Sequence, residues 1–303
     1  MNQAKLPSWR PGAVRDAIEA FLDAAEMIPV ERRVAVFDHD GTLWCEKPRY
    51  AQLEFYQREL RAAVAQRPRL LDRAEYQAVL DGDRVAIGQL GPVNVALALA
   101  ELHHGMTPEE YEARVRDFFA TARHADRGVP LSQMRYRPML ELIGELRARL
   151  FSVYLVTGSG TEFVRAISVS FYGIPPEGVV GSQVGYELDH ADGTPRLRRT
   201  REIMGDPNEG PAKIVNIQRS LGRRPILAVG NSAGDSQLLE YALASDAPAL
   251  AMLLHHDDAE REYAYESVAE SFESREPIVD TARRRGWNVV SMRRDWATVF
   301  ANA

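Results

Sequence analysis

Short runs of consecutive hydrophobic residues alternate along the chain with segments that have the hydrophobic period of a helix. The main runs are 34–37, 152–157, 225–230, 249–253 and 288–291. They are apolar throughout, so they predict strands that are covered on both faces, as in a parallel sheet. Helical segments lie between them, at about 137–149, 161–171, 210–221 and 234–244. This alternation predicts a doubly wound α/β fold.

An N-terminal amphipathic helix is predicted over 11–28, with Val14, Ile18, Phe21, Leu22 and Ala25 on one face. By contrast, residues 46–135 show only helical periodicity, for example at Val93, Ala96, Leu97 and Ala100 and at Tyr111, Val115, Phe118 and Phe119. This segment is too long for a loop. We expect a helical cap domain at 46–135, inserted into an α/β domain made of 1–45 and 136–303.

A smaller feature lies between the second and third hydrophobic runs. Residues 189–194, Asp-His-Ala-Asp-Gly-Thr, form a polar turn signal between the segments 184–188 and 196–199. The pattern predicts a β-hairpin that leaves the main sheet.

Composition excludes several classes of function. The chain has 303 residues, 45% of them hydrophobic, and a net charge of −6. It has no basic run for nucleic acid and no apolar stretch of membrane-spanning length, so we expect neither partner. The N-terminus lacks the apolar core of a signal peptide, and the single cysteine, Cys45, suits a reducing compartment. We expect a cytoplasmic protein, or a periplasmic one if an export signal was removed. No pattern indicates a particular oligomeric state.

Polar side chains follow three of the predicted strands. They are Asp38 and Asp40 after the first strand, Thr157 and Gly158 at the end of the second, and Asn231 and Asp235 after the third. Lys213 lies near the start of the helix before the third strand. Ligands of open α/β sheets bind beyond the carboxyl ends of the strands, so we expect these residues to form one site.

With these motifs the chain resembles the haloacid dehalogenase (HAD) superfamily, especially its phosphoserine phosphatase-like members with a helical cap. The resemblance covers roughly 33–255. It rests on Asp38-His39-Asp40-Gly41-Thr42, Thr157, Lys213, the stretch Gly230–Asp235 and the position of the helical insertion. It implies a Rossmann-like core and Mg²⁺ as cofactor.

The resemblance also implies roles for the site residues. Asp38 would attack phosphorus and form an aspartyl-phosphate, and Asp40 would protonate the leaving oxygen and then activate water. Thr157, the backbone around Gly158, and Lys213 would bind the phosphate. The metal ligands would come from Asp38, the Asp40 carbonyl, Asn231 and Asp235.

One position departs from the family pattern. Asn231 stands where the family usually has an aspartate that binds magnesium. An amide oxygen can still coordinate, but with one negative charge fewer, so we expect weaker Mg²⁺ binding and a role for Asp235 mainly in orienting waters or Lys213.

Substrate contacts are predicted for a few residues after the first motif. Glu46 lies near the position where phosphoserine phosphatases read a substrate amino group, and Trp44 and the cap cations Arg49 and Arg84 are further candidates. Each of them has an ordinary alternative, as a helix start, a packing aromatic or a surface arginine.

Other polar groups are interpreted as structural. We expect Cys45 to be a small buried hydrophobe, and the pairs His103-His104 and His255-His256 not to share a metal, because neighbouring helical side chains diverge. The acids Asp257, Asp258, Glu260, Glu262 and Glu266 are predicted to form a solvated face.

The sequence therefore favours a Mg²⁺-dependent phosphatase of a small phosphorylated metabolite, with phosphoserine-like or broad specificity. The alternatives are a phosphomutase of the same fold and a non-catalytic, phosphate-binding regulatory protein.

Overall fold

The computed structural model describes residues 6–190, 193–267 and 276–301, so that Ala191 and Asp192 of the predicted hairpin turn lie outside the described residues. Its main sheet has six parallel strands in the order β3-β2-β1-β6-β7-β8. The strands are β1 (Val34–Phe37), β2 (Ser152–Gly160), β3 (Val179–Ser182), β6 (Leu227–Gly230), β7 (Leu250–His255) and β8 (Asn288–Ser291). Five of them are confirmed predictions; β3, a short run broken by Gly181, escaped the hydrophobic pattern.

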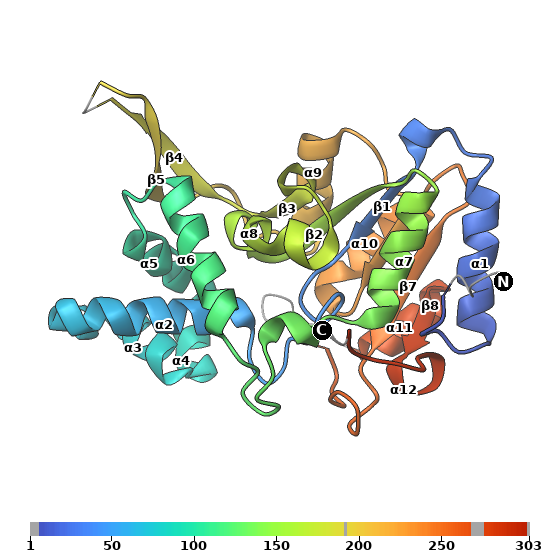
Figure 1. Cartoon of the computed structure of the whole chain (residues 1–303), viewed down its shortest axis with the longest axis horizontal. Helices are drawn as coiled ribbons and strands as arrows, with labels where there is room; N and C mark the ends of the chain where they lie inside the picture. Colours follow the sequence, from blue (N-terminus) through green and yellow to red (C-terminus); the bar gives the residue numbers. More distant parts are fainter. Residues whose placement is uncertain (1–5, 191–192, 268–275, 302–303) are drawn as a thin grey trace.

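Helices cover both faces of this sheet (Figure 1). They are α1 (Ala13–Ala25), α7 (Arg137–Ala148), α8 (Thr161–Tyr172), α9 (Pro211–Leu221), α10 (Ser236–Leu243), α11 (Ile278–Arg285) and the short α12 (Met292–Asp295). Successive side chains of β1 point to opposite faces, so Ala35 and Phe37 pack with α1, α7 and α8, and Val34 and Val36 pack with α9, α10 and α11. The continuous apolar run of β1 is explained by this two-sided burial.

The insertion after β1 contains helices and no strand in its described residues, together with non-helical connections such as 122–130. Its helices are α2 (Ala51–Gln66), α3 (Ala74–Asp81), α4 (Arg84–Leu90), α5 (Pro92–Leu102) and α6 (Pro108–Thr121). They form the cap, which stands to one side of the sheet domain in Figure 1. α2, α3 and α5 share a small hydrophobic core of their own, whereas α6 packs against α8 of the sheet domain. The exact boundaries of the two domains stay a prediction.

A two-stranded antiparallel hairpin confirms the prediction for the segment after β3. β4 (Val184–Asp189) pairs with β5 (Arg196–Ile203), and both extend toward the cap beside α5 and α6 (Figure 1). Arg199 of β5 forms an ion pair with Glu162 of α8, and its guanidinium lies 3.9 Å from the ring centre of Tyr111 of α6. The hairpin thus connects the cap to the sheet domain.

Among the described residues, no single helix is long and apolar enough to cross a membrane. The segments Arg84–Leu90 and Val93–Leu102 pass that test of length and composition only as a pair, bent by 99°.

Candidate active site

The candidate site lies where the chain changes direction across the sheet. β1 and β6 are neighbours, and the chain runs outward from them to β2 and β3 on one side and to β7 and β8 on the other. A crevice forms at such a point beyond the carboxyl ends of the strands. Asp38 follows β1 there, and its N–H donates to the carbonyl of Val229 in β6 at 2.9 Å.

A buried lysine joins two of the predicted carboxylates. Lys213 Nζ donates to Asp38 Oδ1 at 2.7 Å and to Asp235 Oδ1 at 2.6 Å, and the lysine side chain is almost completely buried. Burial lowers the pKa of Lys213, but the two carboxylates more than offset this, so its pKa is raised and it stays charged. Lys213 therefore supplies a fixed positive charge beside Asp38.

The pKa of Asp38 is raised well above its ordinary value. Burial is the largest cause and the nearby charge of Asp235 adds to it, whereas Lys213 opposes both. Desolvation makes a carboxylate a stronger base and nucleophile than it is in water. Lys213 partly offsets this effect by stabilising the ionised form of Asp38.

Asp235 acts through its neighbours. Its Oδ2 accepts the N–H groups of Asn231 at 3.0 Å and Ser232 at 3.1 Å, while Oδ1 binds Lys213. The side chain is fully buried and does not line the cavity above Asp38. This geometry favours the predicted positioning role over direct metal coordination.

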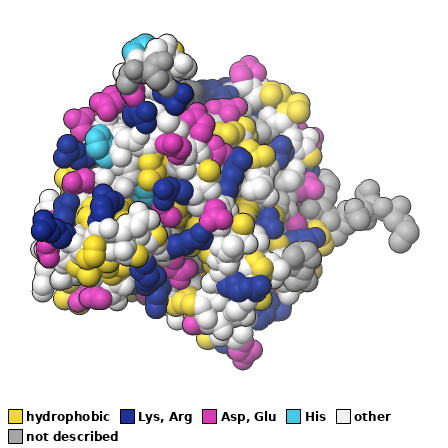
Figure 2. Space-filling view, turned by 60° about the vertical axis from the view of Figure 1, so that its left-hand side comes forward, with side chains coloured by type: hydrophobic (Ala, Val, Ile, Leu, Met, Phe, Trp, Pro, Cys, Tyr) yellow, Lys and Arg dark blue, Asp and Glu magenta, His cyan; other side chains and the backbone are white. Residues whose placement is uncertain are grey.

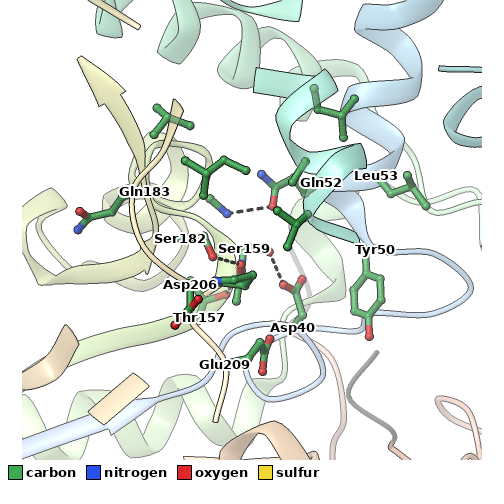
Figure 3. A pocket seen from close by; sticks show the side chains of 18 of the residues that line it. Asp40, Tyr50, Gln52, Leu53, Thr157, Ser159, Ser182, Gln183, Asp206 and Glu209 are labelled. Atoms are coloured by element: carbon green, nitrogen blue, oxygen red, sulfur yellow. Dashed lines mark hydrogen bonds between the residues drawn. The ribbon is translucent and has the colours of Figure 1, made fainter. Parts of the chain in front are cut away.

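Asp40 is held by two donors. Trp44 Nε1 donates to Oδ1 at 2.9 Å, and the Ser159 hydroxyl donates to Oδ2 at 2.7 Å. Burial raises the pKa of Asp40, but the charge of His39 and these hydrogen bonds lower it below its ordinary value. Asp40 is therefore ionised and fixed in orientation at the edge of the cavity (Figure 3).

The end of β2 supplies the third side of the site. The Thr157 hydroxyl accepts the N–H of Ser159 at 3.0 Å, and the N–H of Gly160 donates to Gln52 Oε1 of α2 at 3.0 Å. A side chain at Gly158 would overlap the Glu209 carboxylate. Two backbone donors near the predicted phosphate position are thus already engaged, and one of them ties the cap to β2.

The oxygen donors near Asp38 suit a hard divalent cation. The Thr42 hydroxyl lies 3.3 Å from both Asp38 Oδ2 and Asn231 Oδ1, which places these two oxygens on the same side of the site. No cluster of three or more His, Cys, Asp or Glu side chains that could hold a metal occurs in the described ranges. Mg²⁺ commonly keeps several waters and needs few protein oxygens, so the Asp38 and Asn231 oxygens fit it, and the Asp40 carbonyl stays a predicted third ligand.

Gly41 is required at its position for two reasons. Its φ of 73° lies in the left-handed region, and a Cβ there would overlap the Asn231 amide. The turn after Asp40 therefore allows the Asn231 side chain to reach Asp38 and directs the chain toward the cap.

A cavity of about 610 Å³ opens above these residues, between the sheet domain, α2, α5 and the hairpin. Its lining includes Asp38, Asp40, Thr157, Gly158, Lys213 and Asn231. Glu209, Ser159 and Gln52 also line it, and Figure 3 shows them around the same space. The sequence places Ser159 at the end of the second strand beside Thr157, but Glu209 and Gln52 were not predicted, although Glu209 lies just before the helix of Lys213.

The predicted substrate residues have different outcomes. Glu46 lines the cavity, and burial raises its pKa. Trp44 is buried, stacks on His39 and does not line the cavity. Arg49 and Arg84 are exposed, and neither is among the cavity-lining residues. The structure thus brings only Glu46 of these four to the cavity wall.

The prediction of a solvated acidic face is wrong for Asp258 and Glu262, which are both buried. Glu262 is 2% exposed, and its carboxylate accepts from Tyr136 at 2.8 Å and from the Cys45 thiol at 2.9 Å. His256 Nδ1 lies 3.2 Å from the same carboxylate, and its Nε2 lies 2.9 Å from the carbonyl of Gly41. Glu262 is buried because the segment after β7 packs inside the protein. Through His256 it stabilises the Asp38–Gly41 turn.

Comparison with known proteins identifies the family. A model of the haloacid dehalogenase-like hydrolase family matches residues 35–240, which is more than half of the chain. No curated protein sequence matches significantly.

Solved structures show the same fold at low identity. A protein of unknown function from Bordetella pertussis Tohama I is 20% identical, with a TM-score of 0.53, and the match covers 86% of this chain and 98% of that one. A functionally unknown protein from Anaerococcus prevotii DSM 20548 is 14% identical, with a TM-score of 0.59, and the match covers 92% and 91% of the two chains.

A phosphoserine phosphohydrolase-like protein from Francisella tularensis is 17% identical, with a coverage of 83% and 99% and a TM-score of 0.41 that is too low to bear on function. On the family match and the architecture, this chain belongs to the haloacid dehalogenase-like hydrolases.

Proposed function

We propose that this hydrolase is a Mg²⁺-dependent phosphatase that cleaves a small phosphomonoester through an aspartyl-phosphate intermediate on Asp38. The observation that carries the proposal is the arrangement of Lys213 between Asp38 and Asp235, at the base of a cavity that also holds Asp40. A buried nucleophile beside a fixed cation, with a second carboxylate nearby, is suited to phosphoryl transfer.

In the first step an oxygen of Asp38 attacks phosphorus, and the bond between phosphorus and the alcohol oxygen breaks. Lys213 offsets the negative charge that Asp38 and the phosphoryl oxygens bring together, and the hydroxyl of Thr157, which lines the same cavity, would donate to one of these oxygens. Asp40 is ionised in the free protein, so it first takes the proton that the phosphomonoester monoanion brings into the site, and it then gives this proton to the departing alkoxide.

In the second step water attacks the phosphorus of the aspartyl-phosphate. Asp40, now a carboxylate, takes the proton from that water, and the phosphorus–Asp38 bond breaks to release inorganic phosphate and restore Asp38. The low pKa of Asp40, maintained by His39, Ser159 and Trp44, fits this second role.

The metal site supports the same chemistry. Asp38, Asn231 and the Asp40 carbonyl would hold Mg²⁺, which when bound reduces the repulsion between a carboxylate and a phosphate dianion. Gly41 and Thr42 keep the Asp38 and Asn231 oxygens on one side of the site.

The proposal is tested by measuring phosphate release from p-nitrophenyl phosphate and O-phospho-L-serine while Mg²⁺ is titrated. Asp38→Asn should lower kcat/KM by roughly 10⁴-fold or more, because the nucleophile is lost. Asp280→Asn, on the exposed face of α11, is the matched control and should behave like the wild type.

Asp40→Asn separates the acid role from general damage to the site. p-Nitrophenolate leaves without protonation, so this variant should lose much less activity in the first step with that substrate than with an alkyl phosphate. Phosphate release that is absent at every Mg²⁺ concentration from folded wild-type protein would refute the proposal.

A further inference from the structure

Helix α5 carries hydrophobic side chains on two sides. Val95, Ala98 and Leu99 are buried in the cap core with Leu60, Tyr76 and Val79. Val93, Ala96, Leu97 and Ala100 line the cavity, which Leu99 also reaches, and Val93 and Leu97 are 51% and 40% exposed. The stripe that the sequence pattern predicts for burial in protein therefore partly faces an open space above Asp38.

Other segments extend this apolar surface. Tyr50, Leu53 and Tyr56 contribute from the start of α2, and Val184 and Ile203 contribute from the two strands of the hairpin. Figure 3 shows Tyr50 and Leu53 on the cap side of the cavity, across from Thr157 and Glu209. Three separate chain segments thus supply hydrophobic surface to one wall. Figure 2 shows the cap face of the molecule, where most hydrophobic side chains stand among charged ones.

The charges in the cavity are strongly unequal. The described lining residues include five acids, namely Asp38, Asp40, Glu46, Asp206 and Glu209. Lys213 is the single lysine or arginine among the described lining residues, and both of its carboxylate contacts are within the protein. A carboxylate on the alcohol part of a substrate would be surrounded by acidic and hydrocarbon side chains. Burying that carboxylate without a positively charged partner is costly.

We propose that the cavity selects phosphomonoesters of hydrocarbon-rich alcohols that carry no negative charge, and this inference rests on the proposed phosphatase function. The phosphate lies against Asp38 and Lys213, and the hydrocarbon body extends along Val93, Leu97 and Leu53. A cavity of about 610 Å³ is in the range that encloses a whole small ligand. Contact with the substrate removes Val93 and Leu97 from water, and this explains why these two side chains are exposed on a helix whose other side is buried.

The test is a series of straight-chain alkyl phosphates from ethyl to octyl, with O-phospho-L-serine as the carboxylated comparison. Each added methylene that becomes buried is worth about 0.8 kcal/mol, or about fourfold in kcat/KM. We expect kcat/KM to rise along the series until the chain fills the cavity, and O-phospho-L-serine to be a poorer substrate than butyl phosphate.

Two variants locate the effect on α5. Val93→Gln and Leu97→Gln should each reduce the ratio of kcat/KM for octyl over ethyl phosphate by about fivefold to tenfold. The control is Val85→Gln on α4, because Val85 is 70% exposed but does not line the cavity. The ratio is measured within each variant, so a partly unfolded sample does not alter it.

The outcomes distinguish the two proposals. Phosphate release with no dependence on chain length, or with O-phospho-L-serine as the best substrate, overturns this inference and leaves the phosphatase function standing. A rise with chain length that Val93→Gln and Leu97→Gln leave unchanged also overturns the assignment to α5. Absence of phosphate release from every compound instead refutes the phosphatase function itself.

Discussion

The wall of the cavity that the sheet domain supplies is polar and fixed by hydrogen bonds, whereas the wall that the cap supplies is apolar and partly exposed. Asp38, Asp40 and Lys213 each have one or more partners between 2.6 and 2.9 Å. Val93 and Leu97 face the same space without any polar contact in their side chains and with about half of their surface accessible.

We infer from this difference that the polar wall carries out the reaction and that the apolar wall selects the substrate. Groups that hold and move charge must be fixed before the substrate arrives, because reorganising them during the reaction would raise its barrier. Hydrophobic contacts are non-directional and need only a surface of suitable shape. A cap wall of this type can therefore change its preferred substrate by substitution while the residues at the strand ends keep the same chemistry.

After the loss of the nucleophile itself, the largest effect is expected at Lys213, the cation of the polar wall. Lys213→Met leaves Asp38 and Asp235 buried without their shared partner. We expect kcat/KM to fall by roughly 10² to 10³-fold and the free energy of unfolding to fall by about 3–5 kcal/mol. Phosphate release and urea denaturation measure the two effects.

The double variant Lys213→Met with Asp235→Asn is the control, since it removes the charge of one of the two carboxylates that the loss of Lys213 leaves buried without a partner. It should recover part of the stability but little of the activity. Wild-type activity in Lys213→Met would show that the lysine has no part in catalysis.

A smaller effect is expected where this chain departs from the family pattern. Asn231→Asp adds a negative charge beside Asp38, so the Mg²⁺ concentration for half-maximal activity should fall by roughly tenfold. The increase in Tm on adding Mg²⁺ alone should also be larger than in the wild type. An unchanged Mg²⁺ midpoint in both measurements would mean that residue 231 does not contact the metal.

The support behind the polar wall is tested by its pH dependence. Burial raises the pKa of Glu262, but hydrogen bonds from His256 and Cys45 and the charge of His256 lower it below the ordinary value of 4.5. A lowered pKa stabilises the folded state above about pH 4.5, and this stability is lost as the pH falls through the folded pKa.

Glu262→Gln should therefore cost about 1–3 kcal/mol of unfolding free energy at pH 7 and progressively less below pH 4.5. Chemical denaturation at several pH values measures this difference. Glu260→Gln is the control, because Glu260 is exposed in the same segment. An equal loss at all pH values would indicate a steric effect and not an electrostatic one.

The smallest effects on stability and substrate preference are expected from alanine substitutions at two valines of α5. Val95 is 5% exposed in the cap core, and Val95→Ala should lower the free energy of unfolding by about 2 kcal/mol without changing the preference for long alkyl phosphates. Val93→Ala should change stability by less than about 0.5 kcal/mol and should reduce that preference. If both variants lower stability equally, the outer face of α5 is part of the protein core and not a substrate surface.

The strand ends were predictable because the rule that places ligands there depends only on the order of strands and helices. Runs such as 34–37 and 225–230 identify buried strands, and the polar residues after them must then meet at one edge of a parallel sheet. Lys213 was found for the same reason, since its helix leads into β6. Glu209 and Gln52 were missed, because a single acid or amide in a loop or helix carries no periodic signal.

The sequence by itself determined the doubly wound sheet, the helical insertion after Asp40 and the set of polar residues at the strand ends, because local hydrophobic period and chain order encode all three. Only the tertiary structure decided that Glu262 is buried against Cys45 and Tyr136, that Arg49 lies away from the cavity, and that Val93 and Leu97 face it. A hydrophobic stripe marks a face that avoids water in some state of the protein, but the partner that covers it depends on long-range packing that no local pattern specifies.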